Sequence, residues 1–323
     1  MNNETSWYEI KYIRKKRKIR RIVTYRDEKM RDVHFKIKEY LEKNLFFSKF
    51  TKAYVKDSSI FLNAKAHMYN DVFIKLDIQN FFNSINHDVL HETLYYELNK
   101  NNMDKQVTKM EIAKLINLCS IDRKGLPLGL ITSPVLSNIY LKEFDNILYG
   151  TLKKWNMENT IYTRYADDLT ISFKSHSGVS NELVEQLITL TSKLLKKYKL
   201  KINPSKVSIV DLNVSNHVRI TGVSITKGVN NYRRISVGRK RINDLYHNSI
   251  EMHRKLKLDG ICPNDVDYMR IKQIKGMESF IYSVEKEGYE RIFSQEMQKQ
   301  IRDFGFDSLT ELIKSLPEKK FGQ

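Results

Sequence analysis

The chain has 323 residues, enough to bury a substantial hydrophobic core and to form two or three domains or subdomains. Its 56 lysine and arginine residues against 38 aspartate and glutamate residues give a formal net charge of +18, which favours a polyanionic partner, nucleic acid before membrane, over a merely basic composition. No apolar run reaches the length of a membrane span and the N-terminus lacks the regions of a signal peptide, so we expect a cytoplasmic enzyme without a membrane partner.

The first predicted element is a basic β-hairpin over residues 7–25. Apolar residues alternate loosely along it, and five consecutive basic residues, Arg14 to Lys18, lie in its middle. The strand pattern holds these charges on a ribbon that could lie along phosphates, and a solvated charge run is the alternative. Apolar residues at helical spacing then predict a structural helix over residues 27–47, with Met30, Val33, Ile37, Tyr40 and Leu41 on one face.

The first acidic candidate is Asp77, at the end of a near-continuous apolar run over residues 72–78. Such a run is typical of a buried strand. Burying an unpaired carboxylate is costly, so we expect Asp77 to reach the surface or to face a cation. A helix N-cap role is less natural, because Asn86 or Asp88 is better placed to cap the next helix.

A loop over residues 125–134, punctuated by glycine and proline, leads into another predicted helix. Ser133 is a good N-cap, and Pro134 suits the first helical turn. The helix start could bind a phosphate, with a plain loop-to-helix junction as the alternative. The predicted buried face contains Leu136, Ile139, Tyr140, Phe144 and Ile147.

A second acidic element, Asp167 and Asp168, is predicted at the tip of a hairpin. The flanking residues 161–164 and 169–173 read as strands. Adjacent carboxylates repel each other, and a turn that only connected strands would more naturally use Asn-Gly or Asp-Gly, although a solvated turn is the alternative. Together with Asp77, the pair could hold two Mg²⁺ ions for phosphoryl or nucleotidyl transfer.

The rest of the chain is predicted to form a helix, a turn with a strand, a hairpin and a basic helical region. Lys206, in the turn, could approach a phosphate, although most lone lysines do not. The basic helical region begins with Arg239, Lys240 and Arg241 and is expected to bind nucleic acid. These elements cover residues 180–200, 201–207, 220–237 and 238–323.

The order of these motifs resembles that of a reverse transcriptase from about Arg20 to about Val237. Leu76 to Phe82 is similar to the first catalytic palm motif of the family, Leu126 to Pro134 to its proline-glycine motif, and Tyr165 to Asp168 to its catalytic hairpin. The resemblance implies an α+β right-hand polymerase fold, with an antiparallel palm sheet packed on helices. The implied domains are fingers at 1–71, a palm at 72–225 with a helical fingers insertion around 100–125, and a basic, mostly helical, RNA-binding thumb at 226–323.

Two shorter motifs resemble the retron branch of the family. Asn63-Ala64-Lys65-Ala66-His67 is similar to its Asn-Ala-x-x-His element, and Ile220-Thr221-Gly222 to its Val-Thr-Gly element. One departure is Leu128, where the family usually has a glutamine beside the incoming nucleotide. His67 by itself is expected to be packed or to cap a helix, since no second His or Cys lies at metal spacing.

The resemblance also implies roles for individual residues. Asp77, Asp167 and Asp168 would bind two Mg²⁺ ions, with the carbonyl of Ile78 as a further ligand. Phe82 would be the steric gate against ribonucleotides, with Phe81 in the core. Arg21 would contact the triphosphate, and Lys206 would protonate the leaving pyrophosphate. Weakly implied RNA-binding residues are Asn63, His67, Arg239, Lys240 and Arg241.

The implied function is that of an RNA-directed DNA polymerase of a retron-like antiphage system. A structured non-coding RNA would be template and primer, deoxynucleoside triphosphates the substrates and a branched RNA–DNA hybrid the product, with an effector protein as a further partner. A defence-associated reverse transcriptase that makes unbranched DNA is one alternative. A catalytically silent RNA-binding subunit is another: the three acids argue against it and Leu128 for it. A nuclease is poorly supported, because no further acidic cluster or histidine base is evident.

Overall fold

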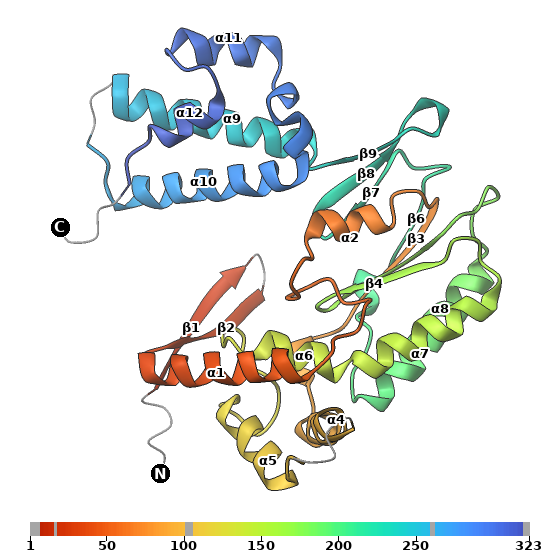
Figure 1. Ribbon diagram of the computed structural model, residues 1–323. Helices are drawn as coiled ribbons and strands as arrows, with labels where there is room; N and C mark the ends of the chain where they lie inside the picture. Colours follow the sequence, from red (N-terminus) through yellow and green to blue (C-terminus); the bar gives the residue numbers. More distant parts are fainter. Residues whose placement is uncertain (1–6, 16–17, 101–105, 259–261, 319–323) are drawn as a thin grey trace. The chain divides into compact units, whose positions relative to one another are not determined.

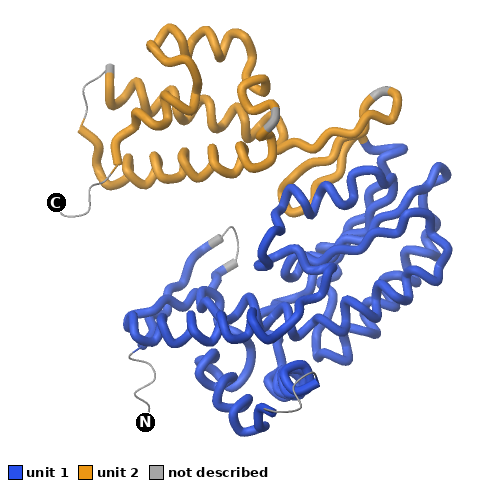
Figure 2. The backbone as a smooth tube through the Cα atoms, in the orientation of Figure 1, with its two compact units in different colours: residues 1–215 blue, residues 216–323 orange. Residues whose placement is uncertain are grey.

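The computed structural model describes residues 7–15, 18–100, 106–258 and 262–318. It divides into two compact units, residues 1–215 and residues 216–323 (Figure 2). The first unit contains mixed helices and antiparallel strands, and the second a small sheet followed by helices (Figure 1). The expected α+β class is therefore confirmed. None of the described helices is both long enough and apolar enough to cross a bilayer.

The N-terminal hairpin and helix form where they were predicted. Strands β1 (Tyr8–Lys15) and β2 (Lys18–Tyr25) pair antiparallel, with Tyr8 opposite Tyr25. Lys16 and Arg17 of the predicted basic run lie outside the described residues. Helix α1 (Glu28–Asn44) begins after Asp27, whose side chain accepts a hydrogen bond from the amide of Lys29. The predicted apolar face is partly wrong: Val33 and Tyr40 are exposed, and the buried position between them is His34.

The central sheet of the first unit has the strand order β4-β5-β3-β6, and all its pairs are antiparallel. Strand β3 (Val72–Asp77) lies between β5 (Asp168–Phe173) and β6 (Ser208–Asp211), and β4 (Ile161–Tyr165) lies on the far side of β5. An interior strand covered on both faces has no solvated side. The apolar run that predicted β3 follows from this position.

Helices pack with this sheet around one hydrophobic core. Buried leucines of α4 (His87–Asn99) and α8 (Asn181–Lys197) join the apolar side chains of β3 there. Of the two predicted caps, Asn86 and Asp88, it is Asn86 that caps α4, by accepting a hydrogen bond from the amide of Val89. The other helices of the unit are α2 (Ile60–Ala66), α3 (Phe81–Ser84), α5 (Lys109–Leu118), α6 (Ser133–Tyr140) and α7 (Lys142–Leu152).

The helix predicted after the glycine-proline loop needs two corrections. Ser133 is the first residue of α6 and not its N-cap, a position that Thr132 occupies, and the Ser133 hydroxyl donates to the carbonyl of Pro127 at 2.6 Å. The single predicted helix is also two helices, separated at Leu141. In the second helix Phe144 and Leu148 are buried, whereas Ile147 is 37% exposed and not buried as predicted.

The second unit has its own small sheet and helical layer. Strands β7 (His217–Ile220), β8 (Val223–Lys227) and β9 (Arg233–Ser236) pair antiparallel in that order, so the predicted hairpin is a three-stranded sheet. Gly222, at φ +87°, completes the tight β7–β8 turn. The helices are α9 (Arg239–His253), α10 (Asp265–Glu285), α11 (Gln295–Asp303) and α12 (Leu309–Lys314).

The boundary between the two units falls between residues 215 and 216. The predicted palm ends at 225, ten residues after this boundary. In the structure, the β7–β8 hairpin belongs to the same compact unit as the C-terminal helices and not to the unit of the central sheet. The predicted fingers at 1–71, palm at 72–225 and thumb at 226–323 stay a prediction, because compactness alone does not define these domains.

Candidate active site

The three predicted acids meet at one end of the central sheet. Asp77, the last residue of β3, lies directly opposite Asp168, the first residue of β5. The amide of Ile78 donates to the carbonyl of Asp167 at 2.9 Å, so the β4–β5 turn is tied to the end of β3. The structure therefore places the backbones of all three acids side by side, and their role in catalysis stays a prediction.

The turn that carries Asp167 has an unfavourable backbone conformation. Ala166 adopts φ +56°, a left-handed value that costs a residue with a side chain about 1–2 kcal/mol. Glycine is the usual residue where a hairpin turn requires a positive φ. Surrounding contacts must therefore hold Ala166 in place, and the buried guanidinium of Arg164, whose nitrogen lies 3.4 Å from the Ala166 carbonyl, makes one of them.

Crowding raises the pKa of both turn carboxylates. Burial and the negative charges of Asp167 and Asp77 raise the pKa of Asp168 to about 6, although Asp168 keeps an exposed edge. Burial and the charge of Asp77 also raise the pKa of Asp167. The positive charge of Lys206 works to lower the pKa of both carboxylates, but both pKa values stay raised. The site thus concentrates more negative charge than its own cation neutralises.

Asp77 is held by two side chains from the segment before β6. Asn203 donates to one carboxylate oxygen at 3.1 Å, and the ammonium of Lys206 forms a short ion pair with the other. Asp77 is nearly buried, whereas Lys206 is half exposed. Burial works to lower the pKa of Lys206, but the hydrogen bond and charge of Asp77 outweigh it and raise that pKa. Sequence reasoning placed Lys206 near phosphate and missed Asn203.

The donor set of this site suits a hard divalent cation. Carboxylate oxygens are the ligands that Mg²⁺ commonly takes from proteins, and a cation would relieve the repulsion among Asp77, Asp167 and Asp168. In the part of the chain that the structure describes, no three or more His, Cys, Asp or Glu side chains are grouped so that they could hold a metal ion. The three carboxylates therefore suit Mg²⁺ by their chemistry, but their side chains would have to reorient to bind the ion.

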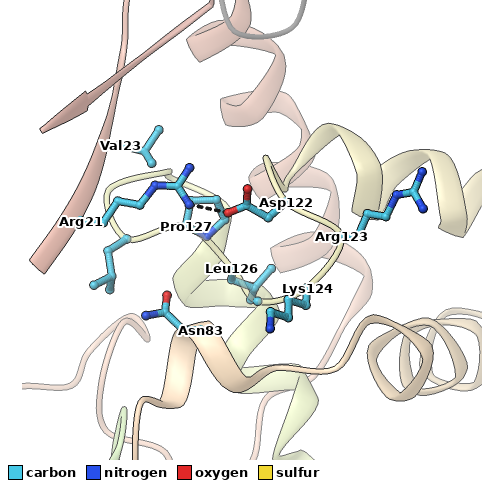
Figure 3. A pocket seen from close by; sticks show the side chains of 10 residues that line it. Arg21, Val23, Asn83, Asp122, Arg123, Lys124, Leu126 and Pro127 are labelled. Carbon is cyan, nitrogen blue, oxygen red and sulfur yellow. Dashed lines mark hydrogen bonds and ion pairs between the residues drawn. The ribbon is translucent and has the colours of Figure 1, made fainter. Parts of the chain in front are cut away.

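A cavity of about 520 Å³ lies between β2, α3 and the loop before α6 (Figure 3). Two predicted nucleotide-binding residues, Arg21 and Leu128, line it together. Arg21 forms a short ion pair with Asp122, drawn as a dashed line in Figure 3. Sequence reasoning missed Asp122 and Asn83, which also line the cavity. The polar residues before Gly125 predict a surface loop, but no sequence pattern predicts that this loop lies next to β2.

Backbone contacts fix the loop that carries Leu128. The amide of Val23 donates to the Leu128 carbonyl at 2.8 Å. The next residue, Gly129, has φ +107°, and a Cβ there would lie 2.2 Å from the Val23 carbonyl oxygen. No other residue could follow Leu128 at this approach. The backbone of the cavity wall is therefore set independently of the side chain at position 128.

Phe81 and Phe82 are buried to different degrees, and Phe81 lies in the core as predicted. Phe81 is 3% exposed and belongs to the core, whereas Phe82 is only partly buried against it. The two rings lie 5.3 Å apart, and the Phe82 carbonyl accepts a hydrogen bond from Leu126. Phe82 thus keeps exposed ring surface beside the glycine-proline loop, and its steric-gate role stays a prediction.

The predicted RNA contacts of Asn63 and His67 are wrong for this structure. Asn63 is 1% and His67 0% exposed, so neither side chain offers a surface to RNA. The two ring nitrogens of His67 lie 2.7 Å from the hydroxyls of Ser172 and Thr163. These hydroxyls belong to β5 and β4, the two strands joined by the turn that carries Asp167. His67 is therefore a packed residue that links both strands, as its isolated position in the sequence predicted.

The basic start of α9 lines a separate cavity within the second unit. Its volume is about 610 Å³, and Arg219 faces it together with the three predicted residues Arg239, Lys240 and Arg241. Arg239 and Lys240 are exposed. Arg241 is half-buried: it donates to the Gly222 carbonyl and its guanidinium lies 4.9 Å from the Phe280 ring centre. The structure groups these residues in one cavity, and RNA binding by them stays a prediction.

Comparisons with known proteins identify a family and several relatives of this chain. Residues 13–225 match the family of reverse transcriptases (RNA-dependent DNA polymerases). The retron Ec83 reverse transcriptase of Escherichia coli is 29% identical over 279 residues, 84% of this chain and 81% of that protein. The retron Ec73 reverse transcriptase of Escherichia coli is 27% identical over 179 residues, 53% of this chain and 56% of that protein.

Solved structures support the fold. The apo telomerase of Candida tropicalis aligns with a TM-score of 0.53 at 12% identity, over 97% of this chain and 64% of that one. The expected right-hand polymerase fold is thereby confirmed. A family match over most of the chain, curated retron relatives and three adjacent acids at the sheet end lead to one conclusion: the chain belongs to the reverse transcriptases, RNA-directed DNA polymerases, and is of the retron type.

Proposed function

We propose that this reverse transcriptase copies a structured non-coding RNA into DNA at Asp77, Asp167 and Asp168. The observation that carries the proposal is the antiparallel register that sets Asp77 opposite Asp168, with Asp167 bonded to the next residue of β3. Two Mg²⁺ ions, when bound there with the carbonyl of Ile78, would activate the primer hydroxyl and neutralise the charge on the transferring phosphoryl group. The raised pKa values of both turn acids support binding of such cations.

The cavity between β2 and the loop before α6 would receive the incoming deoxynucleoside triphosphate. Arg21 would contact the triphosphate, which would compete with Asp122 for its guanidinium. Leu128 would lie against the nucleotide as an apolar side chain, with Asn83 as an amide on the same cavity wall. Phe82 would exclude a ribose 2′-hydroxyl through its exposed ring surface.

Lys206 would donate a proton to the leaving pyrophosphate. Its pKa is raised, so the ammonium keeps its proton at neutral pH. It is half exposed and already points at Asp77, which would place the acid next to the reacting phosphates. A general acid must hold its proton until the leaving group develops charge, and Lys206 meets that requirement.

The second unit would hold the RNA through its phosphates. Arg219, Arg239 and Lys240 share one cavity wall, a concentration of positive charge that suits the backbone of an RNA stem. We extend the proposal to priming from an RNA 2′-hydroxyl, to a branched RNA–DNA product, and to antiphage defence together with an effector protein. Similarity to the retron relatives is what supports this extension.

The proposal is tested on the protein purified from its native locus. The co-purifying nucleic acid is sequenced with and without ribonuclease and debranching treatment. A short DNA joined to RNA through a 2′ linkage is the expected result. Unbranched DNA would instead identify a defence reverse transcriptase outside the retrons, and RNA without DNA would identify a silent binding subunit. An Asp167→Asn/Asp168→Asn variant, purified in parallel, shows which DNA depends on this site.

A further inference from the structure

Arg164 is the largest fully buried side chain among the described residues, and it lies three residues before Asp167. Its partner Asp145, on α7, is also 0% exposed. Two guanidinium nitrogens donate to the two carboxylate oxygens of Asp145 at 2.8 Å each. A charged pair of this kind is rarely buried so completely, and the role proposed above for the three acids does not account for it.

The same guanidinium reaches the catalytic turn. One of its nitrogens lies 3.4 Å from the carbonyl of Ala166 and 3.3 Å from the side-chain oxygen of Asn138, on α6. The backbone of Arg164 is held as well, because its amide donates to Phe50 at 2.8 Å and its carbonyl accepts from Lys52 at 2.7 Å. The backbone of Arg164 is thus held by Phe50 and Lys52, and its guanidinium is held by Asp145.

Stability alone does not explain the pair. Taking two charges out of water is costly, and replacing a buried ion pair by apolar side chains of similar size is often neutral or stabilising. The feature nearby that needs support is the left-handed conformation of Ala166. Its carbonyl faces the guanidinium, and the carbonyl of the next residue, Asp167, accepts from Ile78 in β3. Two different residues therefore hold the two peptides of the turn: Arg164 contacts the carbonyl of Ala166, and the amide of Ile78 contacts the carbonyl of Asp167.

We propose that Arg164 is a positioning residue for the catalytic turn, supported by Asp145 and Asn138. Through it, helices α6 and α7 set the orientation of the peptide that joins Ala166 to Asp167, and hence the direction of the Asp167 carboxylate. The inference rests on the proposed function of Asp167 and Asp168. It makes the buried ion pair a determinant of the rate of nucleotide addition, not of nucleotide or RNA binding.

The test is a variant that removes both charges of the pair, so that neither is left buried without the other. Arg164→Met alone would leave the carboxylate of Asp145 buried and unpaired, and Asp145→Leu would leave the hydroxyl of Tyr162, which donates to Asp145 at 2.8 Å, without its acceptor. The variant is therefore Arg164→Met/Asp145→Leu/Tyr162→Phe. The matched control is Glu97→Leu/Lys142→Met, which removes another nearly buried ion pair, with atoms 2.6 Å apart, that joins the first residue of α7 to α4 and not to the turn.

The triple variant is expected to melt no lower than the parent and to bind RNA equally well. Its kcat should fall about 100-fold, the effect of a small misplacement of reacting groups, while KM for the nucleotide changes less than about threefold. Amide hydrogen exchange in the peptide covering residues 161–173 should become faster. The control should keep the parental kcat and exchange rates.

Two results would overturn the inference. A folded triple variant with parental kcat and exchange rates would remove Arg164 from any positioning role, and a variant with a lower melting temperature and weaker RNA binding would make the pair purely structural. Failure of the proposed function is recognised separately, because Asp167→Asn/Asp168→Asn would then still synthesise DNA. The hydrogen-exchange measurement tests whether Arg164 holds the turn in place, whether or not the turn acids catalyse DNA synthesis.

Discussion

Acidification below pH 6.5 should destabilise residues 1–215 through His67. Burial, together with the positive charge of Lys52, lowers the pKa of His67 to about 3. In the neutral form, one ring nitrogen can donate and the other accept, which satisfies the hydroxyls of Thr163 and Ser172. The protonated form would have two donors and a charge that the buried site does not solvate.

The direction and size of the effect follow from linkage. Between pH 6.5 and 3, the unfolded chain binds a proton at His67 and the folded chain does not, so stability is full above pH 6.5 and is lost as the pH falls. Each pKa unit corresponds to about 1.36 kcal/mol, so at pH 5 the loss is about 2 kcal/mol. His34, whose pKa burial also lowers, should add to the loss in the same direction.

The assay compares the parent with His67→Gln, whose amide can still bond both hydroxyls but does not titrate. Urea unfolding is followed by tryptophan fluorescence at pH 7.5 and pH 5, because the two tryptophans, Trp7 and Trp155, both lie in residues 1–215. The parent should lose about 2 kcal/mol more than the variant over this interval. His176→Gln, at an exposed position of the same unit, is the control and should behave as the parent. Equal losses in parent and His67→Gln, within about 0.5 kcal/mol, would refute the reasoning.

Three further predictions concern the site and the RNA. Asp167→Asn/Asp168→Asn should abolish primer extension and spare RNA binding in a filter assay, and retained synthesis would exclude the proposed site. Phe82→Ala should reduce discrimination against ribonucleotides by about 10- to 200-fold in competition kinetics, whereas unchanged sugar selection would remove its gate role. Arg239→Gln/Lys240→Gln should weaken RNA binding and flatten the log–log salt dependence of affinity by about two units, and an unaltered slope would show that RNA does not contact these side chains.

The sequence predicted best what depends on neighbours along the chain. The apolar run ending at Asp77 and the alternating strands around Asp167 are local patterns, and both strands form there. Their meeting was inferred only from the chemistry of acids near a cation, and the antiparallel register then placed Asp77 opposite Asp168. The N-cap at Asn86 was found because capping involves residues three apart.

Contacts between distant segments could not be predicted in the same way. Lys206 and Asp77 are 129 residues apart, and Arg21 and Asp122 are 101 apart, so no periodicity connects them. Arg164 read as an ordinary strand residue, because its burial depends on helices that supply Asp145. The sequence offers no signal for such pairs beyond an arginine inside an apolar strand.

The error at His67 has a general physical reason. A polar residue in a recognisable motif was interpreted as a contact for RNA, but a polar side chain can be retained because two strands need it. His67 joins the hydroxyls of Thr163 in β4 and Ser172 in β5, and its 0% exposure leaves no surface for a ligand. The strands it joins carry the turn with Asp167, so the motif still concerns the candidate site, through packing rather than through RNA recognition.

The backbone contacts that hold the cavity wall at Leu128 do not involve the side chain of that residue. The bond from the Val23 amide to the Leu128 carbonyl uses backbone atoms only, and the close approach at Gly129 depends on the absence of a side chain there. Neither contact depends on which side chain residue 128 carries. The loop therefore keeps its position whether a leucine or a glutamine stands at 128. The function proposed for the cavity then assigns the consequence of the leucine to how the nucleotide is held, because the cavity has no amide at 128 and has one at Asn83.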